Sequence, residues 1–168
     1  MRQRDRESYH EFIRVRSGPL YRSACLLTGG DTHLAEDMVQ ETFGRMYSAW
    51  SRRSCIENPV GYAQKVLIRA HLTHRRRRSS GERPVDGLPD HGTEGEDTPL
   101  RVTLLTALSQ LSAEDRAVLV LRFWEDLSVE RTAEVMRTTP GAVRSRSGRA
   151  LTRLRAVLGA RDITELTA

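Results

Sequence analysis

The feature that most constrains this fold is the segment at residues 137–158, RTTPGAVRSRSGRALTRLRAVL. Thr139 can cap a helix through its hydroxyl, and Pro140 suits the first helical position, where its missing N–H costs nothing. Apolar residues then recur along one side at helical spacing: Val143, Ala150, Leu151, Leu154, Val157 and Leu158. The opposite side carries Ser145, Arg149 and Thr152, flanked by Arg144 and Arg146. Because no acidic residue occurs from 137 to 155, the pattern predicts a helix that lies against phosphate.

The preceding residues make this prediction more specific. Residues 126–136 predict a short helix, after which Arg137–Thr139 form a turn. Ala133 is small enough for two crossing helices to approach closely, and Met136 and Val143 would close the core between them. A helix, a short turn and an arginine-bearing second helix make a helix-turn-helix, in which the second helix enters the major groove of DNA. The alternative is an ordinary helical hairpin with solvated arginines, but the absence of acidic residues favours DNA.

The composition favours a small protein with a polyanionic partner. The chain has 168 residues, 38% hydrophobic and 5% aromatic, which allows one or two small domains. Its formal charge of +5 and sequence pI near 9.8 indicate an acidic macromolecule as partner. Cys25 and Cys55 fit no metal-binding or CxxC spacing, so no metal and no cofactor is predicted. With no membrane-length apolar stretch and no signal peptide in residues 1–11, we expect a soluble, cytoplasmic protein without membrane insertion.

Residues 79–99 divide the chain into two parts. They are rich in glycine, proline and acidic residues and poor in apolar ones, which predicts a flexible acidic linker. The flanking units, residues 1–78 and 100–168, contain no useful stretch of alternating apolar and polar residues. The predicted fold is therefore all-α, with two small helical domains.

Each unit has its own predicted helices. In the first unit we expect one or two helices within 9–28, interrupted near Gly18-Pro19, and further helices over 33–50 and 60–78. In the second unit, Ser112 with Asp115 three residues later predicts a capped helix start ahead of the helix-turn-helix.

Four segments, taken in order, resemble a known family. Residues 26–43, LLTGGDTHLAEDMVQETF, and 58–67, NPVGYAQKVL, closely resemble the second conserved region of bacterial sigma factors. Residues 111–122, LSAEDRAVLVLR, and 140–146, PGAVRSR, look like the fourth. Two such regions joined by a short linker are the layout of the extracytoplasmic-function (ECF) class, group IV of the sigma-70 family. The LLTG stretch and the SRSGRAL ending are similar to its sigma-E-like actinobacterial subgroup.

The resemblance implies an RNA polymerase-binding function for the first unit. The helix matching residues 34–50 would dock on the β′ clamp through Asp37, Gln40 and Glu41, which share one polar face. A merely solvated face is the alternative. The helix matching 60–78 and the loop before it would handle the −10 promoter element. Its candidate contacts are Lys65, Arg69, His71, His74, Arg75 and Arg76, with Arg77 and Arg78 either contacts or a nonspecific basic tail.

For the second unit, the resemblance implies contact with the β flap and recognition of the −35 element. Candidate DNA contacts are Thr138, Thr139, Arg144, Ser145, Arg146 and Arg149, and the sequence does not separate base contacts from phosphate contacts. Several residues depart from the family pattern, namely Arg69 and His74 in the first unit and Arg137, Ala142 and Ser147 in the second. Arg137 stands where relatives have glycine, so it strains the turn if that position needs a positive φ.

The alternatives to a sigma factor are an autonomous DNA-binding regulator and an enzyme. A conventional helix-turn-helix regulator would bind duplex DNA by itself, and it would need neither the docking helix nor a surface for separated strands. An enzyme is not expected, because the scattered histidines form no catalytic constellation with carboxylates or cysteines, and no catalytic residues are predicted. An anti-sigma factor is a partner compatible with the class. Because the sequence ends at Ala168, no third, regulatory domain is expected.

Overall fold

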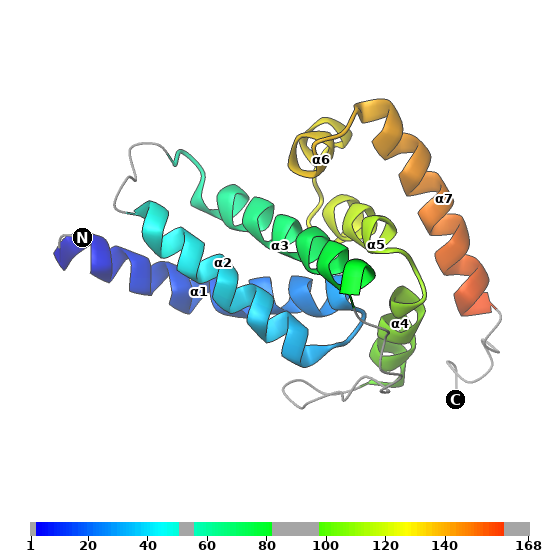
Figure 1. The fold of residues 1–168 in the computed structure, drawn as a ribbon, viewed down its shortest axis with the longest axis horizontal. Helices are drawn as coiled ribbons and strands as arrows, with labels where there is room; N and C mark the ends of the chain where they lie inside the picture. The colour runs from blue at the N-terminus through cyan, green and yellow to red at the C-terminus, as the bar shows by residue number, and fades with distance from the viewer. Residues whose placement is uncertain (1–2, 51–55, 82–97, 160–168) are drawn as a thin grey trace.

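The computed structural model describes residues 3–50, 56–81 and 98–159; for residues 76–81 it describes the backbone alone. Within these ranges every regular element is a helix, which confirms the all-α prediction (Figure 1). The elements are α1 (Gln3–Thr28), α2 (Thr32–Trp50), α3 (Pro59–Gly81), α4 (Pro99–Ser109), α5 (Ala113–Leu119), the π-helical turn η2 (Val120–Trp124), α6 (Val129–Met136) and α7 (Pro140–Gly159). No helix in the described part of the chain is long and apolar enough to cross a bilayer.

The helices fall into two groups that lie against each other (Figure 1). Helices α1, α2 and α3 pack side by side, and α4 to α7 form the second group. Residues 79–81, predicted as the start of the linker, continue α3 instead. Most of the predicted linker, residues 82–97, lies outside the described residues, as does Cys55.

The predicted interruption of α1 at Gly18-Pro19 is wrong, because the helix continues through Pro19. A proline inside a helix costs about 3 kcal/mol locally, since it removes one hydrogen bond and crowds the preceding turn. Packing on both sides offsets this cost. Tyr9 lies before the proline and donates its hydroxyl to the Phe43 carbonyl at 2.6 Å. After it, Leu20, Ala24 and Leu27 are buried at helical spacing.

The helix starts in the second unit follow the sequence prediction closely. Ser112 caps α5, with its hydroxyl accepting from the Asp115 amide at 3.1 Å. Thr139 precedes α7, and its hydroxyl accepts from the Ala142 amide at 3.1 Å, with Pro140 at the first helical position. Helices α6 and α7 form the predicted helix-turn-helix. Its core joins α5, α6 and α7 through Val118, Ala133, Val143 and Ala150.

Arg137 occupies a left-handed backbone conformation at the end of α6, with φ 55° and ψ 50°. Only glycine adopts this region without a steric penalty. We therefore expect Arg137→Gly to raise the free energy of unfolding by about 1 kcal/mol, measured by urea denaturation. Arg144→Gly, inside α7, is the matched control and should lower stability by about 1 kcal/mol. A destabilised Arg137→Gly protein would contradict the strain argument.

Candidate nucleic-acid interface

The outer face of α7 presents polar side chains to solvent. Val143 and Ala150 on the inner face are fully buried against the rest of the helix-turn-helix. Ser145 and Arg149 lie on the opposite, exposed face, as predicted, with Arg144 beside them. Thr138 and Thr139 are exposed at the entry to the helix. The fold thus brings five of the six predicted −35 contacts onto one accessible surface: Thr138, Thr139, Arg144, Ser145 and Arg149.

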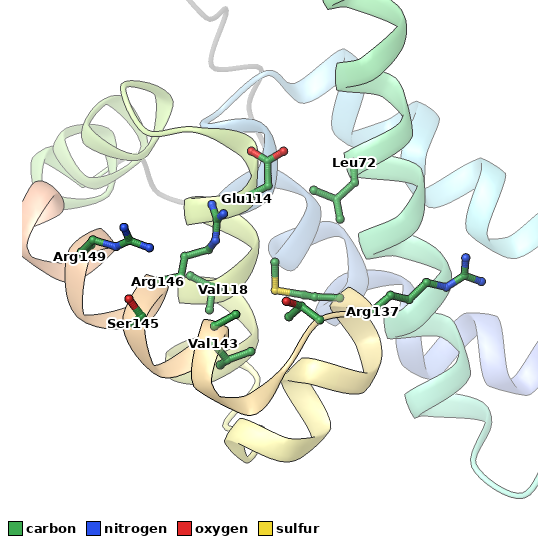
Figure 2. A pocket seen from close by; sticks show the side chains of 11 residues that line it. Leu72, Glu114, Val118, Arg137, Val143, Ser145, Arg146 and Arg149 are labelled. Carbon is green, nitrogen blue, oxygen red and sulfur yellow. The ribbon is translucent and has the colours of Figure 1, made fainter.

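A hollow of about 360 Å³ opens beside this surface, between α7, α5, α6 and α3 (Figure 2). Its lining contains three arginines, Arg137, Arg146 and Arg149, together with Thr138 and Ser145. Glu114 is the acidic residue among the lining side chains. Most polar side chains that line the hollow therefore donate hydrogen bonds, which suits an anionic partner.

The arginines of α7 differ in their own contacts. Arg144 reaches Glu130 at 3.4 Å, and both side chains are mostly exposed, so the pair contributes little. Arg146, the sixth predicted −35 contact, instead lies 3.2 Å from the buried carboxylate of Asp115. Arg149 is exposed and has no ion-pair partner within the residues that the structure describes. Within the described residues, Arg149 and Arg155 are thus the arginines of α7 that are exposed without an ion-pair partner, and Arg149 is the one that lines the hollow.

The predicted −10 contacts lie along α3 with unequal exposure. Lys65 and Arg69 are half-buried, and Arg75 is exposed with Glu114 at 3.7 Å. His74 is half-buried, and its ring nitrogen lies 3.2 Å from Glu41 on α2. Arg76 belongs to α3, but its side chain, like those of Arg77 and Arg78, lies outside the described set.

His71, predicted as a −10 contact, is buried in this structure. His71 is 4% exposed, and its ring nitrogen lies 3.2 Å from the carbonyl of Ala113 in α5. Its side of α3 faces the second helical group, which the helical spacing along α3 alone does not reveal. Burial lowers the pKa of His71 to about 4; Arg116 and Arg75 add to this shift, while the Ala113 hydrogen bond and Glu114 oppose it.

This depressed pKa predicts a loss of stability in mild acid. An unfolded histidine titrates near pH 6.5, so below that pH the unfolded chain takes up a proton that native His71 does not. The stability that neutral, buried His71 contributes is fully present above pH 6.5, and it is lost as the pH falls towards about 4. Between pH 7.5 and 5.5, wild type should lose about 1 kcal/mol more than His71→Gln in urea unfolding. Equal losses in the two proteins would contradict the burial argument.

The predicted polymerase-docking face of α2 is partly occupied by contacts within the chain. Asp37 and Gln40 are exposed. Glu41 is half-buried and pairs with Arg45 at 2.6 Å and with His74 at 3.2 Å. Asp37 and Gln40 are thus the members of this face that are fully open to a partner.

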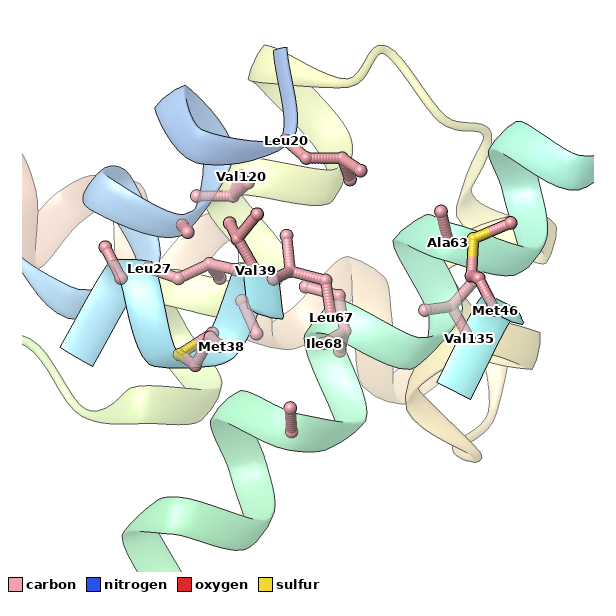
Figure 3. Close-up of a cluster of buried hydrophobic side chains, with 14 of the residues drawn as sticks. Leu20, Leu27, Met38, Val39, Met46, Ala63, Leu67, Ile68, Val120 and Val135 are labelled. Atoms are coloured by element: carbon pink, nitrogen blue, oxygen red, sulfur yellow. The ribbon is translucent and has the colours of Figure 1, made fainter. Parts of the chain in front are cut away.

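The two helical groups share a continuous core (Figure 3). Leu27, Val39 and Leu67 of the first group pack in one cluster with Val120 and Val135 of the second. Polar contacts also join the two groups along this boundary, which we call the seam. Glu125 accepts hydrogen bonds from Ser23 and, at 2.5 Å, from Gln64. The sequence prediction of two tethered domains did not include this contact.

Arg116 of α5 donates hydrogen bonds to four backbone carbonyls, one of which lies across the seam. Its Nε donates to the carbonyl of Leu27 in α1 at 2.6 Å. Its Nη1 donates to the carbonyls of Leu108, Ser109 and Leu111 at 2.9 to 3.2 Å. The carbonyls of Leu27, Leu108 and Ser109 lie at the C-terminal ends of α1 and α4, where the helix dipole concentrates negative charge. Burial lowers the pKa of Arg116 to about 10. In the sequence, this residue looks like any surface arginine of an amphipathic helix.

Two family descriptions match the two helical groups: Sigma-70 region 2 over residues 15–81, and Sigma-70, region 4 over residues 101–154. The RNA polymerase sigma-E factor of Streptomyces coelicolor is 34% identical over 157 residues, which cover 92% of this chain and 88% of that protein. The ECF RNA polymerase sigma factor SigL of Mycobacterium tuberculosis is 34% identical over 155 residues, with 86% and 85% covered. The chain belongs to the ECF sigma factors of the sigma-70 family.

Two solved structures share the fold of this sigma factor. The sigma factor RpoE in complex with the anti-sigma factor NepR, from Bartonella quintana, has a TM-score of 0.74 and 21% identity, covering 92% of this chain and 99% of that one. CnrH in complex with the cytosolic domain of CnrY has a TM-score of 0.63 and 21% identity, covering 94% and 91%. In this sigma factor, α1–α3 form the region 2 unit and α4–α7 the region 4 unit.

Proposed function

We propose that this sigma factor binds core RNA polymerase and directs it to promoters by contacting their −10 and −35 elements. The observation that carries the proposal is the exposed, acid-free outer face of α7, in a chain 34% identical to a sigma-E factor over 157 residues. In this proposal it acts in the cytoplasm, where core polymerase works, and catalyses no reaction itself. The autonomous regulator is not favoured, because both sigma regions are present.

The proposal assigns a separate task to each surface. Region 4 reads the −35 element through α7, with Arg149 and Ser145 at the centre of the contact, and approaches the β flap. Region 2 docks on the β′ clamp through Asp37 and Gln40 of α2. The basic side of α3 binds the −10 element and its separated strands through charge and stacking.

In this structure the region 2 and region 4 units pack against each other, which we call the closed form. This form implies that the two units separate at a promoter. Leu72 of α3 and Arg149 of α7 line the same hollow, so the two DNA-binding helices face one space. The −10 and −35 elements lie about 25 base pairs apart, roughly 85 Å of duplex at about 3.4 Å per base pair. One closed molecule cannot reach both elements. We infer that holoenzyme formation breaks the seam at Arg116 and Glu125.

In vitro transcription tests this proposal. Purified core polymerase would be supplied with a library of promoter fragments, with and without this sigma factor, and the transcript starts sequenced. New starts that require the sigma factor, preceded by shared −10 and −35 sequences, would support it. Specific binding to duplex DNA without any effect on core polymerase would instead favour the regulator.

Asp37→Arg is expected to weaken binding to core polymerase. The substitution reverses an exposed charge on the proposed docking face without touching the buried core. A reversal at a charged contact should raise the dissociation constant by about tenfold, measured by fluorescence anisotropy. Glu7→Arg, an exposed acidic residue of α1 whose hydrogen-bond partner Gln3 lies on the same helix, is the control and should bind nearly as wild type. Unchanged affinity for Asp37→Arg would remove this face from the docking surface.

An anti-sigma factor is a natural partner for the closed form. The solved sigma factor RpoE, whose fold this chain shares, is bound to the anti-sigma factor NepR. We propose that a protein of that class holds this sigma factor with its two units together. Such a partner would stabilise the seam that promoter binding must break.

A further inference from the structure

We propose that Asp115 is a positioning residue of promoter recognition: it fixes α7 and determines which arginines of that helix can contact −35 DNA. The inference rests on the proposed function and deepens it. It concerns a residue of α5 that does not itself lie on the DNA-facing surface.

The carboxylate of Asp115 stands between two arginines of α7. Its side chain is 2% exposed, at the first turn of α5. Oδ1 accepts from Nη1 of Arg146 at 3.2 Å, and Oδ2 accepts from Nη1 of Arg153. Arg146 and Arg153 are seven residues apart, which is about two helical turns, so they project from nearly the same side of α7. One carboxylate therefore binds α7 at two points along the length of the helix.

Because Asp115 is buried, its carboxylate restrains the two arginines that it contacts and leaves Arg149 free. A buried carboxylate is costly unless it is paired and hydrogen-bonded, so Asp115 holds both guanidinium groups firmly. The Arg146 side chain is 39% exposed and the Arg153 side chain 59% exposed, and each uses Nη1 on Asp115, so the carboxylate offsets their charge and each meets phosphate as an uncompensated cation only by leaving Asp115. Arg149, three residues after Arg146, carries no such restraint and is exposed.

The consequence is a restricted set of DNA contacts. With Arg146 and Arg153 held by Asp115, the centre of the recognition surface contains Arg149 and Ser145. Without the carboxylate, both arginines become mobile cations beside the DNA, and α7 loses two of its attachments to α5. Sequence-independent phosphate contact should then increase, and discrimination between correct and incorrect −35 sequences should fall.

Holoenzyme binding to promoter duplexes at different salt concentrations measures this directly. Core polymerase loaded with each variant would be titrated with a promoter found by transcription, and with the same promoter carrying a scrambled −35 element. Each phosphate contact contributes about 0.9 to the slope of log K against log salt. We expect Asp115→Asn to steepen that slope by about 0.9 or more. It should also reduce discrimination between the two promoters about tenfold.

Two further variants separate positioning from mere packing. Val118→Ala removes buried volume from the same α5–α7 core and should lower stability without steepening the salt slope. Arg146→Gln should leave the salt slope at its wild-type value, because Arg146 is held by Asp115 and makes no phosphate contact of its own. A slope that falls by about 0.9 in Arg146→Gln would overturn the inference, as would an unchanged slope in Asp115→Asn. If wild-type holoenzyme ignores the −35 element, the proposed function fails first, and the wild-type titration alone reveals it.

Discussion

Replacing Arg116 with methionine is expected to lower the free energy of unfolding by about 3 kcal/mol, because hydrogen bonds made by a charged group contribute about 1.5–3 kcal/mol each. Arg116 makes four such bonds, to the carbonyls of Leu27, Leu108, Ser109 and Leu111. Methionine has a similar length but no donor, so these carbonyls would lose their guanidinium partner at the seam. The variant no longer has to bury a cation, and this gain offsets part of the lost hydrogen bonding. The expected net loss in the free energy of unfolding is therefore close to the contribution of two bonds.

Urea denaturation of the full chain would measure this change. Arg45→Met is the matched control, since Arg45 is 53% exposed and its ion pair among the described residues is with Glu41 one turn away. Its loss should cost no more than about 0.5 kcal/mol. Energy transfer between dyes on region 2 and region 4 should also show wider separation in Arg116→Met, because the bond to Leu27 joins the two units. An Arg116→Met protein as stable as the control would show that the seam does not depend on this arginine.

Local patterns in the sequence were sufficient for most of the fold. The start of α5 at Ser112 and the start of α7 at Thr139 and Pro140 depend on side chains within three residues of the helix, so the sequence predicts them well. For Arg137 the sequence showed only a departure from the glycine of the family, and the structure supplies the positive φ. The inner and outer faces of α7 are also as predicted, because a helical period defines both faces at once.

Contacts between distant residues account for what the sequence did not show. Helical spacing places His71 on one side of α3 but does not say that α5 covers it. Likewise Arg146 shares the acid-free helix with Arg149, and only the fold brings Asp115, 31 residues earlier in the chain, to the first and not the second. Pro19 is a helix breaker locally, and the tertiary packing that overrides it comes from other helices. The sequence thus identified most of the helices but not α4, and the surroundings of individual polar side chains depend on residues distant in the chain.

Arg149→Ala is expected to weaken promoter binding by the holoenzyme by roughly 10- to 100-fold, the loss of about 1–3 kcal/mol that accompanies one good arginine–guanine contact. Arg149 lies at the centre of the exposed face of α7 and has no ion-pair partner in the described residues, so the substitution removes a contact with DNA and no contact within the protein. Stability should therefore stay within about 0.5 kcal/mol of wild type. Electrophoretic mobility shift of holoenzyme on the promoter duplex would give the affinity.

Arg14→Ala provides the control for this prediction, because Arg14 is an exposed arginine of α1 whose partner, Glu11, lies on the same helix. It carries the same change in net charge, so any general electrostatic effect on DNA binding appears in both variants. Affinity for core polymerase should be equal in wild type, Arg14→Ala and Arg149→Ala, since the docking face lies on α2 in the region 2 unit. If Arg149→Ala lost core binding and promoter binding equally, α7 would be part of the polymerase interface, and the assignment of −35 recognition to its outer face would be wrong.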